Sequence, residues 1–351
     1  MSQYKGLRIG KGKISFLIDK KALIVFLTLL LVSFSVFILS TGLGEMKISP
    51  INVLKVLFGG GTDIHRLVIQ TFRLPRIIIA LMVGISLAVA GGILQGLIRN
   101  PLASPDILGI TGGAAVAVVG FLALFSDESN SLTVSIQWMP VAAFIGAAIV
   151  ALLVYFLAWK NGVSPIRLVL IGIGISALMQ ALTNLMMIMG PIYRASEANI
   201  WLTGTVYGSN WKHVITLVPW TLILLVVVMM MARNVNVQEL GDEIATGVGS
   251  HVQKQRFWLL MLATALIGSS VAFAGGIGFV GLMAPHMARR LVGSAFGALL
   301  PVSALIGGIL VMVADLIGRT MFSPLEVPAG VFTASIGAPY FIYLLFRARN
   351  S

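Results

Sequence analysis

The chain lacks cysteine, so neither disulfide bonds nor thiol chemistry can contribute to its fold or function. Its 351 residues also include few charges, 24 basic and 12 acidic, which are gathered in short clusters. A phosphate-binding loop is missing: residues 6–11 are one residue short of the Gly-x4-Gly-Lys spacing, and Gly12 stands where that motif needs serine or threonine. We therefore expect that this chain is not an enzyme and does not itself hydrolyse ATP.

Motifs for metal binding and for hydrolysis are missing as well. No His-Glu-x-x-His or Gly-x-Ser-x-Gly sequence occurs, which argues against an intramembrane protease or hydrolase. The histidines are scattered without metal-ligand spacing, so we expect no metal site and no bound cofactor; they are His65, His213, His251 and His286.

Between the charged clusters lie apolar runs, several of them close to the ~20 residues that a helix needs to cross a bilayer. The hydrophobic fraction is 58% and the mean hydropathy is +0.99. Because the runs are continuous rather than alternating, they exclude a β-barrel. The sequence predicts an all-α polytopic membrane protein with one transmembrane domain over 1–351. About ten helices are expected, near 23–41, 75–98, 106–125, 137–158, 165–190, 213–232, 256–274, 277–291, 299–318 and 328–346.

The net charge of +12 is interpreted as loop charge that orients the protein in the membrane, and not as a nucleic-acid surface. Residues 1–21 form a basic tail, and the apolar run after it is too long for a signal peptide, so we expect a retained first helix. With this tail in the cytoplasm, 16 of the 24 Lys and Arg residues lie inside and 8 outside. Both termini are therefore predicted to be cytoplasmic.

The apolar stretch over 256–291 is too long for a single span. One helix over 256–291 would be ~54 Å long, so we expect two spans joined by a glycine turn near 275–278.

The sequence LAVAGGI at 87–93 is echoed by VAFAGGI at 271–277. These segments run in opposite directions in the predicted topology, which is typical of the inverted repeats of transporters. Chance similarity between two helices rich in glycine and alanine is the alternative.

Two long motifs flank this pair of segments. The first is FRLPR at 72–76, followed by Gly91-Gly92 and by RNPLASPD at 99–106. The second is GGIGFVGL at 275–282 with Pro285-His286, followed by EVPAG at 326–330. From about residue 15 to the C-terminus the chain closely resembles the permease subunits of type II ABC importers (FecCD-like), a family that takes up iron–siderophore complexes, haem and cobalamin.

The resemblance implies ten helices per subunit and a second permease subunit, identical or related, around a central pathway. It also implies two cytoplasmic ATPases that carry ATP and Mg, an external substrate-binding protein, and a place in the bacterial cytoplasmic membrane. The family's external arginines dock acidic residues of the binding protein, and the matching positions are Arg73, Arg76 and Arg319. Alternatively these arginines lie at the lipid interface or pair internally, since Asp315 is four residues before Arg319.

The resemblance also assigns a coupling segment within 233–255 that contacts the ATPase through two short helices. Gly241 and Gly249 would supply its turns; a solvated loop is the alternative. The coupling residues are Leu240, Gly241, Asp242, Glu243, Ala245 and Gly249. The cytoplasmic gate of the family matches Asn100, Leu102, Pro165 and Ile166, although Pro-Ile departs from the small hydroxyl residues that the family can carry there.

Polar residues within spans usually face the bundle interior. Gln180 and Asn184 share a helix face because they are four residues apart. Such residues either line the pathway or bond to a neighbouring helix, and the candidates are Gln180, Thr183, Asn184, Met187, Thr333 and Ser335.

The predicted function is the permease subunit of an ATP-driven importer, with iron(III)–siderophore complexes as the favoured substrate and haem or cobalamin as alternatives. A secondary transporter driven by an ion gradient is disfavoured, because it normally requires ionisable groups deep in the spans and the predicted spans offer only Asp315, near an end.

Overall fold

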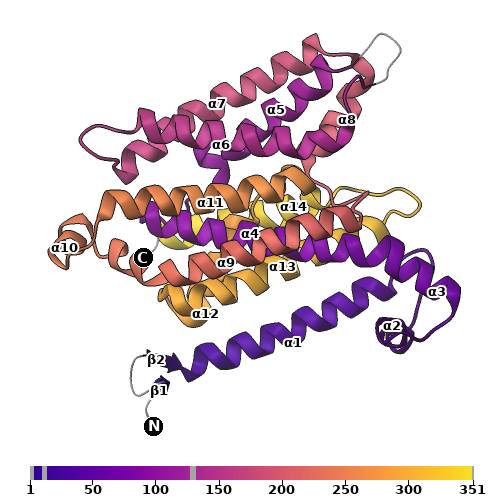
Figure 1. Cartoon of the computed structure of the whole chain (residues 1–351), viewed down its shortest axis with the longest axis horizontal. Helices are drawn as coiled ribbons and strands as arrows, with labels where there is room; N and C mark the ends of the chain where they lie inside the picture. The colour runs from indigo at the N-terminus through magenta and orange to yellow at the C-terminus, as the bar shows by residue number, and fades with distance from the viewer. Residues whose placement is uncertain (1–3, 10–13, 127–131, 350–351) are drawn as a thin grey trace.

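The computed structural model describes residues 4–9, 14–126 and 132–349, so Lys11 and Lys13 of the basic tail lie outside the described residues. Helices occupy all ten positions predicted for spans, and their labels follow Figure 1. They are α1 (Lys20–Gly42), α4 (Leu74–Ile98), α5 (Ile110–Leu124), α6 (Met139–Leu157), α7 (Pro165–Met189), α9 (Trp211–Glu239), α11 (Val252–Ala274), α12 (Val280–Val292), α13 (Phe296–Thr320) and α14 (Ala329–Arg349).

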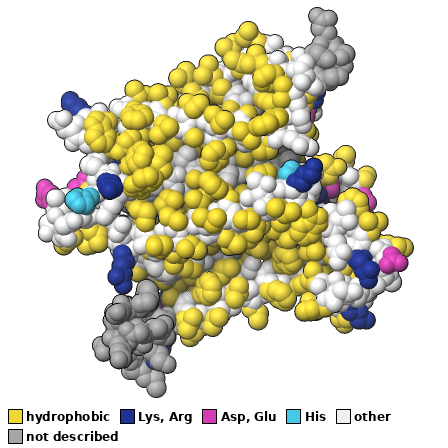
Figure 2. All heavy atoms as spheres, in the orientation of Figure 1, with side chains coloured by type: hydrophobic (Ala, Val, Ile, Leu, Met, Phe, Trp, Pro, Cys, Tyr) yellow, Lys and Arg dark blue, Asp and Glu magenta, His cyan; other side chains and the backbone are white. Residues whose placement is uncertain are grey.

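The helices are long and apolar enough for a multi-pass membrane protein. Seven reach the length and hydropathy of a span, and α5 and residues 329–344 of α14 are shorter apolar helices. Figure 2 shows charged side chains gathered at two opposite ends of the molecule, with a hydrophobic belt between them. Large apolar side chains of this belt are exposed, as expected where lipid replaces water around the protein.

Helix α4 lies at the centre of the bundle, among α9, α11, α12 and α13, while α5, α6 and α7 form a separate tier and α1 flanks α13 (Figure 1). The glycines of α4 allow close packing against neighbouring helices. A Cβ on Gly84 would overlap the backbone of Gly307, and a Cβ on Gly91 would overlap the backbone of Gly281. Small residues give such contact between helices in lipid, where packing replaces the hydrophobic driving force.

The predicted glycine turn after α11 is present, but α12, which follows it, has 13 residues and does not reach the length of a span. Helix α11 ends at Ala274, Gly275 takes a positive φ of 65°, and α12 starts at Val280, three residues later than predicted. Another predicted helix, 106–125, is wrong as a continuous element. It divides into the 3-10 helix η2 (Pro105–Leu108) and α5, because Gly109 between them has a φ of 72°.

The predicted opposition of the two similar segments is seen in the helix directions. Helix α4 runs toward α10 and α11 runs away from it, so residues 87–93 and 271–277 point in opposite directions (Figure 1). The copies differ in structure, since residues 87–93 are helical throughout whereas 275–277 leave the helix.

Several short elements lie outside the predicted spans. A two-stranded antiparallel hairpin precedes α1, a 3-10 helix precedes α6, and a π-helix continues directly into α4. These elements are β1 (Tyr4–Ile9), β2 (Ile14–Asp19), α2 (Pro50–Leu57), α3 (Asp63–Leu67), η1 (Val68–Arg73), η3 (Ile136–Trp138), α8 (Ile192–Thr203) and α10 (Asp242–Gly247).

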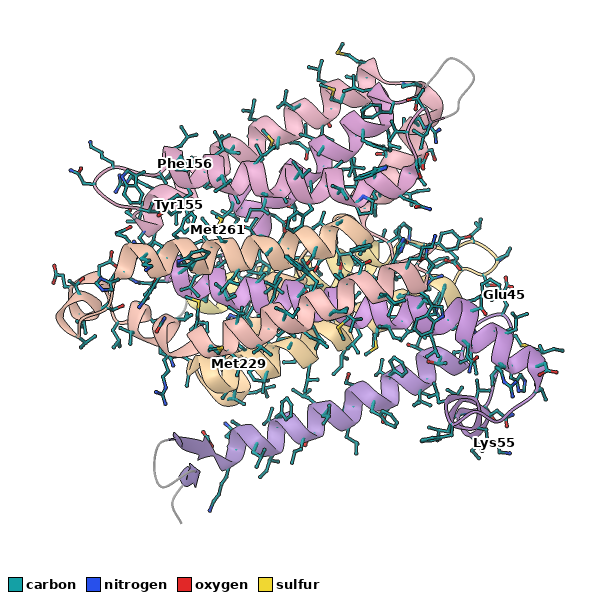
Figure 3. All side chains as sticks on the ribbon, viewed as in Figure 1. Glu45, Lys55, Tyr155, Phe156, Met229 and Met261 are labelled. Atoms are coloured by element: carbon teal, nitrogen blue, oxygen red, sulfur yellow. The ribbon has the colours of Figure 1, made fainter. Side chains whose placement is uncertain are left out.

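The two ends of the bundle carry different short elements. Helices α2, α3 and α8 lie at one end, hereafter the α2 end, where Glu45 and Lys55 are also seen (Figure 3). Helix α10 lies at the opposite end with both termini of the chain, hereafter the α10 end (Figure 1). There Tyr155 of α6 packs against Phe257 of α11 with their ring centroids 5.1 Å apart, which joins the α5–α7 tier to the central helices.

Candidate functional site

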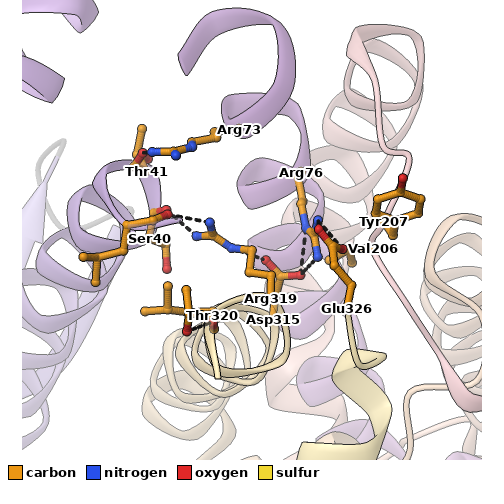
Figure 4. Close-up of polar contacts among 12 residues, drawn as sticks. Ser40, Thr41, Arg73, Arg76, Val206, Tyr207, Asp315, Arg319, Thr320 and Glu326 are labelled. Carbon is orange, nitrogen blue, oxygen red and sulfur yellow. Dashed lines mark hydrogen bonds and ion pairs between the residues drawn. The ribbon is translucent and has the colours of Figure 1, made fainter. Parts of the chain in front are cut away.

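At the α2 end, three arginines and two carboxylates form one network (Figure 4). Arg76, in the first turn of α4, donates to Asp315 at 2.9 Å from Nε and lies 2.8 Å from it at Nη2. Its Nη1 donates to both oxygens of Glu326, at 2.8 and 3.1 Å. Arg76 also lies over the Tyr207 ring, 5.6 Å from its centroid. This guanidinium therefore ties α4 to α13 and to the segment before α14.

The other two arginines of the network bind the end of α1. Arg73 donates to the carbonyls of Thr41 and Gly42 at 2.9 and 3.0 Å, and Arg319 donates to the carbonyl of Ser40. Because α1 has no basic residue in its last turn, these guanidinium groups supply the positive charge that a helix C-terminus favours. Arg319 also pairs with Asp315 at 3.4 Å, the predicted spacing of four residues.

Each of the three predicted docking arginines thus has internal partners, and none of them extends freely from the surface. A cavity of about 330 Å³ opens beside them, lined by Glu45, Phe72, Arg73, Arg76, Arg319 and Glu326 among others. The cluster therefore borders an open cavity, although the Arg76 side chain itself is only 14% exposed.

The predicted coupling segment contains one short helix, α10, where two were expected. Gly241 and Gly249 flank it with φ angles of 112° and 81°, a conformation that side-chain-bearing residues rarely adopt. Ala245 is buried, whereas Leu240, Ile244 and Val248 are exposed by 62%, 54% and 68%. These exposed apolar residues lie outside the spans, with Ile244 on α10 and Leu240 and Val248 beside it, and such a surface is suited to contact with another protein.

Asp242 is the first residue of α10, and its carboxylate is held by two arginines. One oxygen, Oδ1, accepts from Arg256 at 2.9 Å and also from Arg99. Burial by itself would raise the pKa of Asp242, but the hydrogen bonds and charges of Arg256 and Arg99 lower this pKa below its ordinary value. The carboxylate is therefore ionised at neutral pH.

The predicted gate residues lie at the α10 end on two segments. Asn100 follows the end of α4, and its side-chain oxygen accepts from the backbone N–H of Leu102 at 2.9 Å. Pro165 is the first residue of α7, where proline is favoured, and Ile166 is 72% exposed. Both segments are linked to α10, since Arg99 precedes Asn100 and Arg256 donates to the carbonyl of Val163.

The predicted pathway residues divide into exposed and buried groups. Gln180 and Asn184 share an exposed face of α7 and are joined by a hydrogen bond of 3.2 Å, as the spacing predicted. Thr183, by contrast, is buried and donates to the carbonyl of Met179. On α14, Ser335 is exposed, whereas Thr333 is buried and donates to the carbonyl of Gly330. Met187 is half-buried.

Asp106 is a residue whose position the sequence reasoning missed. A Cβ on Gly281 would lie 3.1 Å from Pro105 and 3.0 Å from the carbonyl of Leu87, so this segment lies at the depth of Leu87. Leu87 is ~16 Å before the end of α4 at ~1.5 Å per residue. Asp106 accepts a hydrogen bond from Thr111 at 2.8 Å and is exposed on the single chain.

An ionisable group at membrane depth cannot face lipid without cost, so Asp106 is a candidate functional residue. The sequence signal was Asp106 itself, within RNPLASPD at 99–106, but a helix predicted to start at residue 106 placed it at the membrane surface. Ser176 of α7 donates to the Asp106 backbone carbonyl at 2.5 Å, so Asp106 lies beside the helix that carries Gln180 and Asn184.

Comparison with known proteins gives one consistent result. The model of the FecCD transport family matches residues 29–347. The chain is 62% identical over 333 residues to the "Probable siderophore transport system permease protein YfhA" of Bacillus subtilis (strain 168), covering 95% of this chain and 97% of that protein. It is 45% identical over 329 residues to the iron(3+)-hydroxamate import system permease protein FhuG of the same organism, covering 93% and 98%.

A solved inward-facing structure, described as a metal-chelate type ABC transporter, superimposes with a TM-score of 0.79 at 28% identity, covering 93% of this chain and 99% of that chain. These matches give no support to the alternatives of a gradient-driven secondary transporter or an intramembrane enzyme. The fold and the motifs agree with the family model and with these relatives over almost the whole sequence. The chain belongs to the FecCD transport family of ABC importer permeases.

Proposed function

We propose that this chain forms the membrane pathway of an importer for iron(III)–siderophore complexes. The observation that carries this proposal is the 62% identity, over 95% of the chain, to a permease named for siderophore transport. A permease named for hydroxamate import gives independent support at 45% identity. Haem and cobalamin complexes are the competing substrates.

Uptake of radiolabelled iron tests the substrate. A deletion strain would receive a panel of ferric siderophores, with and without this gene restored. We expect loss and rescue of uptake for one chelate class. Normal uptake across the panel, with loss of haem or cobalamin uptake instead, would contradict the siderophore proposal while leaving the family assignment unchanged.

The proposed orientation places the α10 end in the cytoplasm, with both termini, and the α2 end outside. The excess of basic residues in the loops at the α10 end supports this assignment. Two ATP-binding subunits would then contact the exposed apolar residues on and beside α10, namely Leu240, Ile244 and Val248, and ATP with its Mg would belong to these subunits. The substrate-binding protein would contact the α2 end, and a second permease subunit would complete the pathway.

Replacement of Gly249 by leucine tests the contact of α10 with the ATPase. A side chain at a φ of 81° is strained, so the shape of this segment should change. We expect lost transport with normal membrane insertion. Gly293→Leu is a matched control, because Gly293 has a φ of 80° and also has open space around its Cβ position. Normal transport by Gly249→Leu would contradict the assignment.

At the α2 end, we propose that carboxylates of the binding protein engage Arg76 through the cavity beside it. Arg76→Glu should then weaken binding-protein affinity and uptake. Arg66→Glu reverses charge at the same end but outside the cavity lining, and serves as the control. Unchanged affinity in a folded Arg76→Glu protein would contradict docking and leave the arginine with its internal role.

The pathway is proposed to follow the exposed face of α7 that carries Gln180 and Asn184, together with Asp106 and Ser335. The apolar and highly exposed Ile166, near the α10 end of the same helix, would belong to the cytoplasmic gate with Asn100, Leu102 and Pro165. Because this chain contains no cysteine, single cysteines at these positions can be tested for labelling in the assembled transporter, and the labelled permease is identified by its separation from the partner subunits.

A further inference from the structure

The attachment of α10 to the bundle is concentrated in one carboxylate. Within α10, all of whose residues the structure describes, only Ala245 is buried. Glycines with positive φ precede and follow the helix, at 241 and 249. Such an element, with few buried apolar contacts, is easily displaced. The ion pairs of Asp242 hold it to the rest of the molecule.

The first connection leads to the end of α4. Arg99 donates from Nη2 to Asp242 and from Nε to the carbonyl of Gln238 at 2.8 Å. Its backbone is left-handed, with a φ of 56°, so Arg99 is where α4 stops and the loop of Asn100 and Leu102 begins. A displacement of Asp242 therefore acts directly on the residue that starts this loop.

The second connection leads to the start of α7. Arg256 of α11 is completely buried, and its guanidinium bonds both to Asp242 and to the carbonyl of Val163. The N–H of Val163 donates to the side chain of Gln253 at 2.8 Å, so both backbone groups of Val163 are held by α11. Val163 is two residues before Pro165, and its position sets where α7 begins.

We propose that Asp242 is the positioning residue through which movement of α10 reaches both gate segments, Asn100–Leu102 on one side and Pro165–Ile166 on the other. This inference rests on the proposed function, in which an ATPase moves α10. A guanidinium fork on a carboxylate gives directional, charge-assisted hydrogen bonds, which transmit displacement better than apolar contact does. A switch driven by ATP requires interactions that differ between two states, and these ion pairs would carry that difference from α10 to the gate.

The test uses the complete transporter with reporter cysteines at Leu102 or Ile166, chosen in variants that still transport. The rate at which a water-soluble maleimide modifies each thiol is compared between the nucleotide-free and ATP-bound states. In the otherwise native permease we expect the rate to change about fivefold or more at both positions. In Asp242→Asn we expect the rates in the two states to become equal at both positions, while ATPase subunits stay bound.

Glu239→Gln is the matched control. It removes the negative charge of one carboxylate near α10 and breaks the 3.2 Å ion pair between Glu239 and Arg289. The ion pairs of Asp242 with Arg99 and Arg256 stay in place. We expect its labelling rates to respond to ATP as in the native permease. Arg99→Gln separates the two connections: the response should be lost at residue 102 and kept at residue 166, and this variant leaves the buried Arg256 paired.

Two results would overturn the inference. One is an ATP response in Asp242→Asn equal to that of the native protein. The other is an Arg99→Gln protein that responds, or fails to respond, equally at both positions; this variant decides the matter even if Asp242→Asn does not assemble. Failure of the proposed function has a different signature, because the labelling rates would then be independent of ATP in the native background as well.

Discussion

The two ends of the bundle use the same chemistry with different mechanical consequences. At each end one aspartate pairs with two arginines: Asp315 with Arg76 and Arg319, and Asp242 with Arg99 and Arg256. Helix α4 contributes an arginine near both of its ends. The aspartate, however, belongs to a long, packed helix in one case and to a six-residue helix between two glycines in the other.

Burial separates the two clusters further. The Asp315 side chain is 3% exposed, whereas the Asp242 side chain is 44% exposed. A buried pair of this kind joins packed elements, and removing one partner leaves an uncompensated charge. We therefore interpret the Asp315 cluster as a lock between α1, α4 and α13, and the Asp242 cluster as the attachment of an element that moves.

Asp242→Asn should have the largest effect on transport. We expect uptake per ATP hydrolysed to fall by about tenfold or more, since the neutral amide cannot hold both guanidinium groups. The melting temperature of the purified permease should fall less than that of Asp315→Asn, because Asp242 is 44% exposed, although the buried Arg256 loses its carboxylate partner. Uptake and hydrolysis measured in proteoliposomes check the result, and unaltered coupling would contradict the comparison.

Asp315→Asn should have the opposite profile. Loss of a buried charge that pairs with Arg76 and Arg319 should cost about 3–5 kcal/mol of stability. We expect a clearly lower melting temperature, with coupling of transport to ATP retained below it. A thermal denaturation series in detergent measures this, with Asp63→Asn, an exposed residue at the same end, as the control. A melting temperature equal to that of the native protein would contradict the proposed lock.

Glu326→Gln should have a smaller effect and sharpen the comparison within the α2 end. Glu326 is 37% exposed, so its loss should cost at most about 1 kcal/mol of stability. If the binding protein presents carboxylates to Arg76, removing this competing carboxylate should tighten docking by a few-fold. Titration of the binding protein onto the reconstituted permease measures the affinity. Weaker docking by the variant would count against the proposed competition.

The smallest effect expected is that of pH on the α10 attachment. Arg256 and Arg99 lower the pKa of Asp242, so the folded state binds its proton less readily than the unfolded chain does. The stabilisation is present at pH values above the ordinary aspartate pKa of 3.8 and is lost only as pH falls through the lower folded pKa. Coupling should therefore show no Asp242 titration between about pH 5 and about pH 8.

The sequence predicted most spans because apolar length identifies them: seven described helices reach the length and hydropathy of a span, and α5 and residues 329–344 of α14 are shorter apolar helices. The tenth predicted span corresponds to α12, which has 13 residues and belongs to neither group. Helices α2, α3 and α8 lack that signal, since they lie beyond the predicted spans. The local pair of Asp315 with Arg319 followed from their spacing on one helix, but the pair of Arg76 with Asp315 joins residues 239 positions apart. Such a contact depends on how α4 and α13 pack, which no short-range pattern encodes.

The same limit explains the results at the other candidate sites. Helical spacing correctly put Gln180 and Asn184 on one face, but it could not show that Thr183, one position away, is buried with its hydroxyl bonded to its own helix. The depth of Asp106 depends on how the chain turns back into the bundle after Asn100. This depth becomes visible only in the structure, where the predicted helix is interrupted at Gly109.

The most direct test of the account is the ratio of chelate transported to ATP hydrolysed, measured in the same proteoliposome preparation for the native, Asp242→Asn and Asp315→Asn permeases. We expect this ratio to fall about tenfold for Asp242→Asn and to stay at the native value for Asp315→Asn below its melting temperature. A ratio that falls equally in both variants, or in neither, would contradict the assignment of coupling to the α10 end.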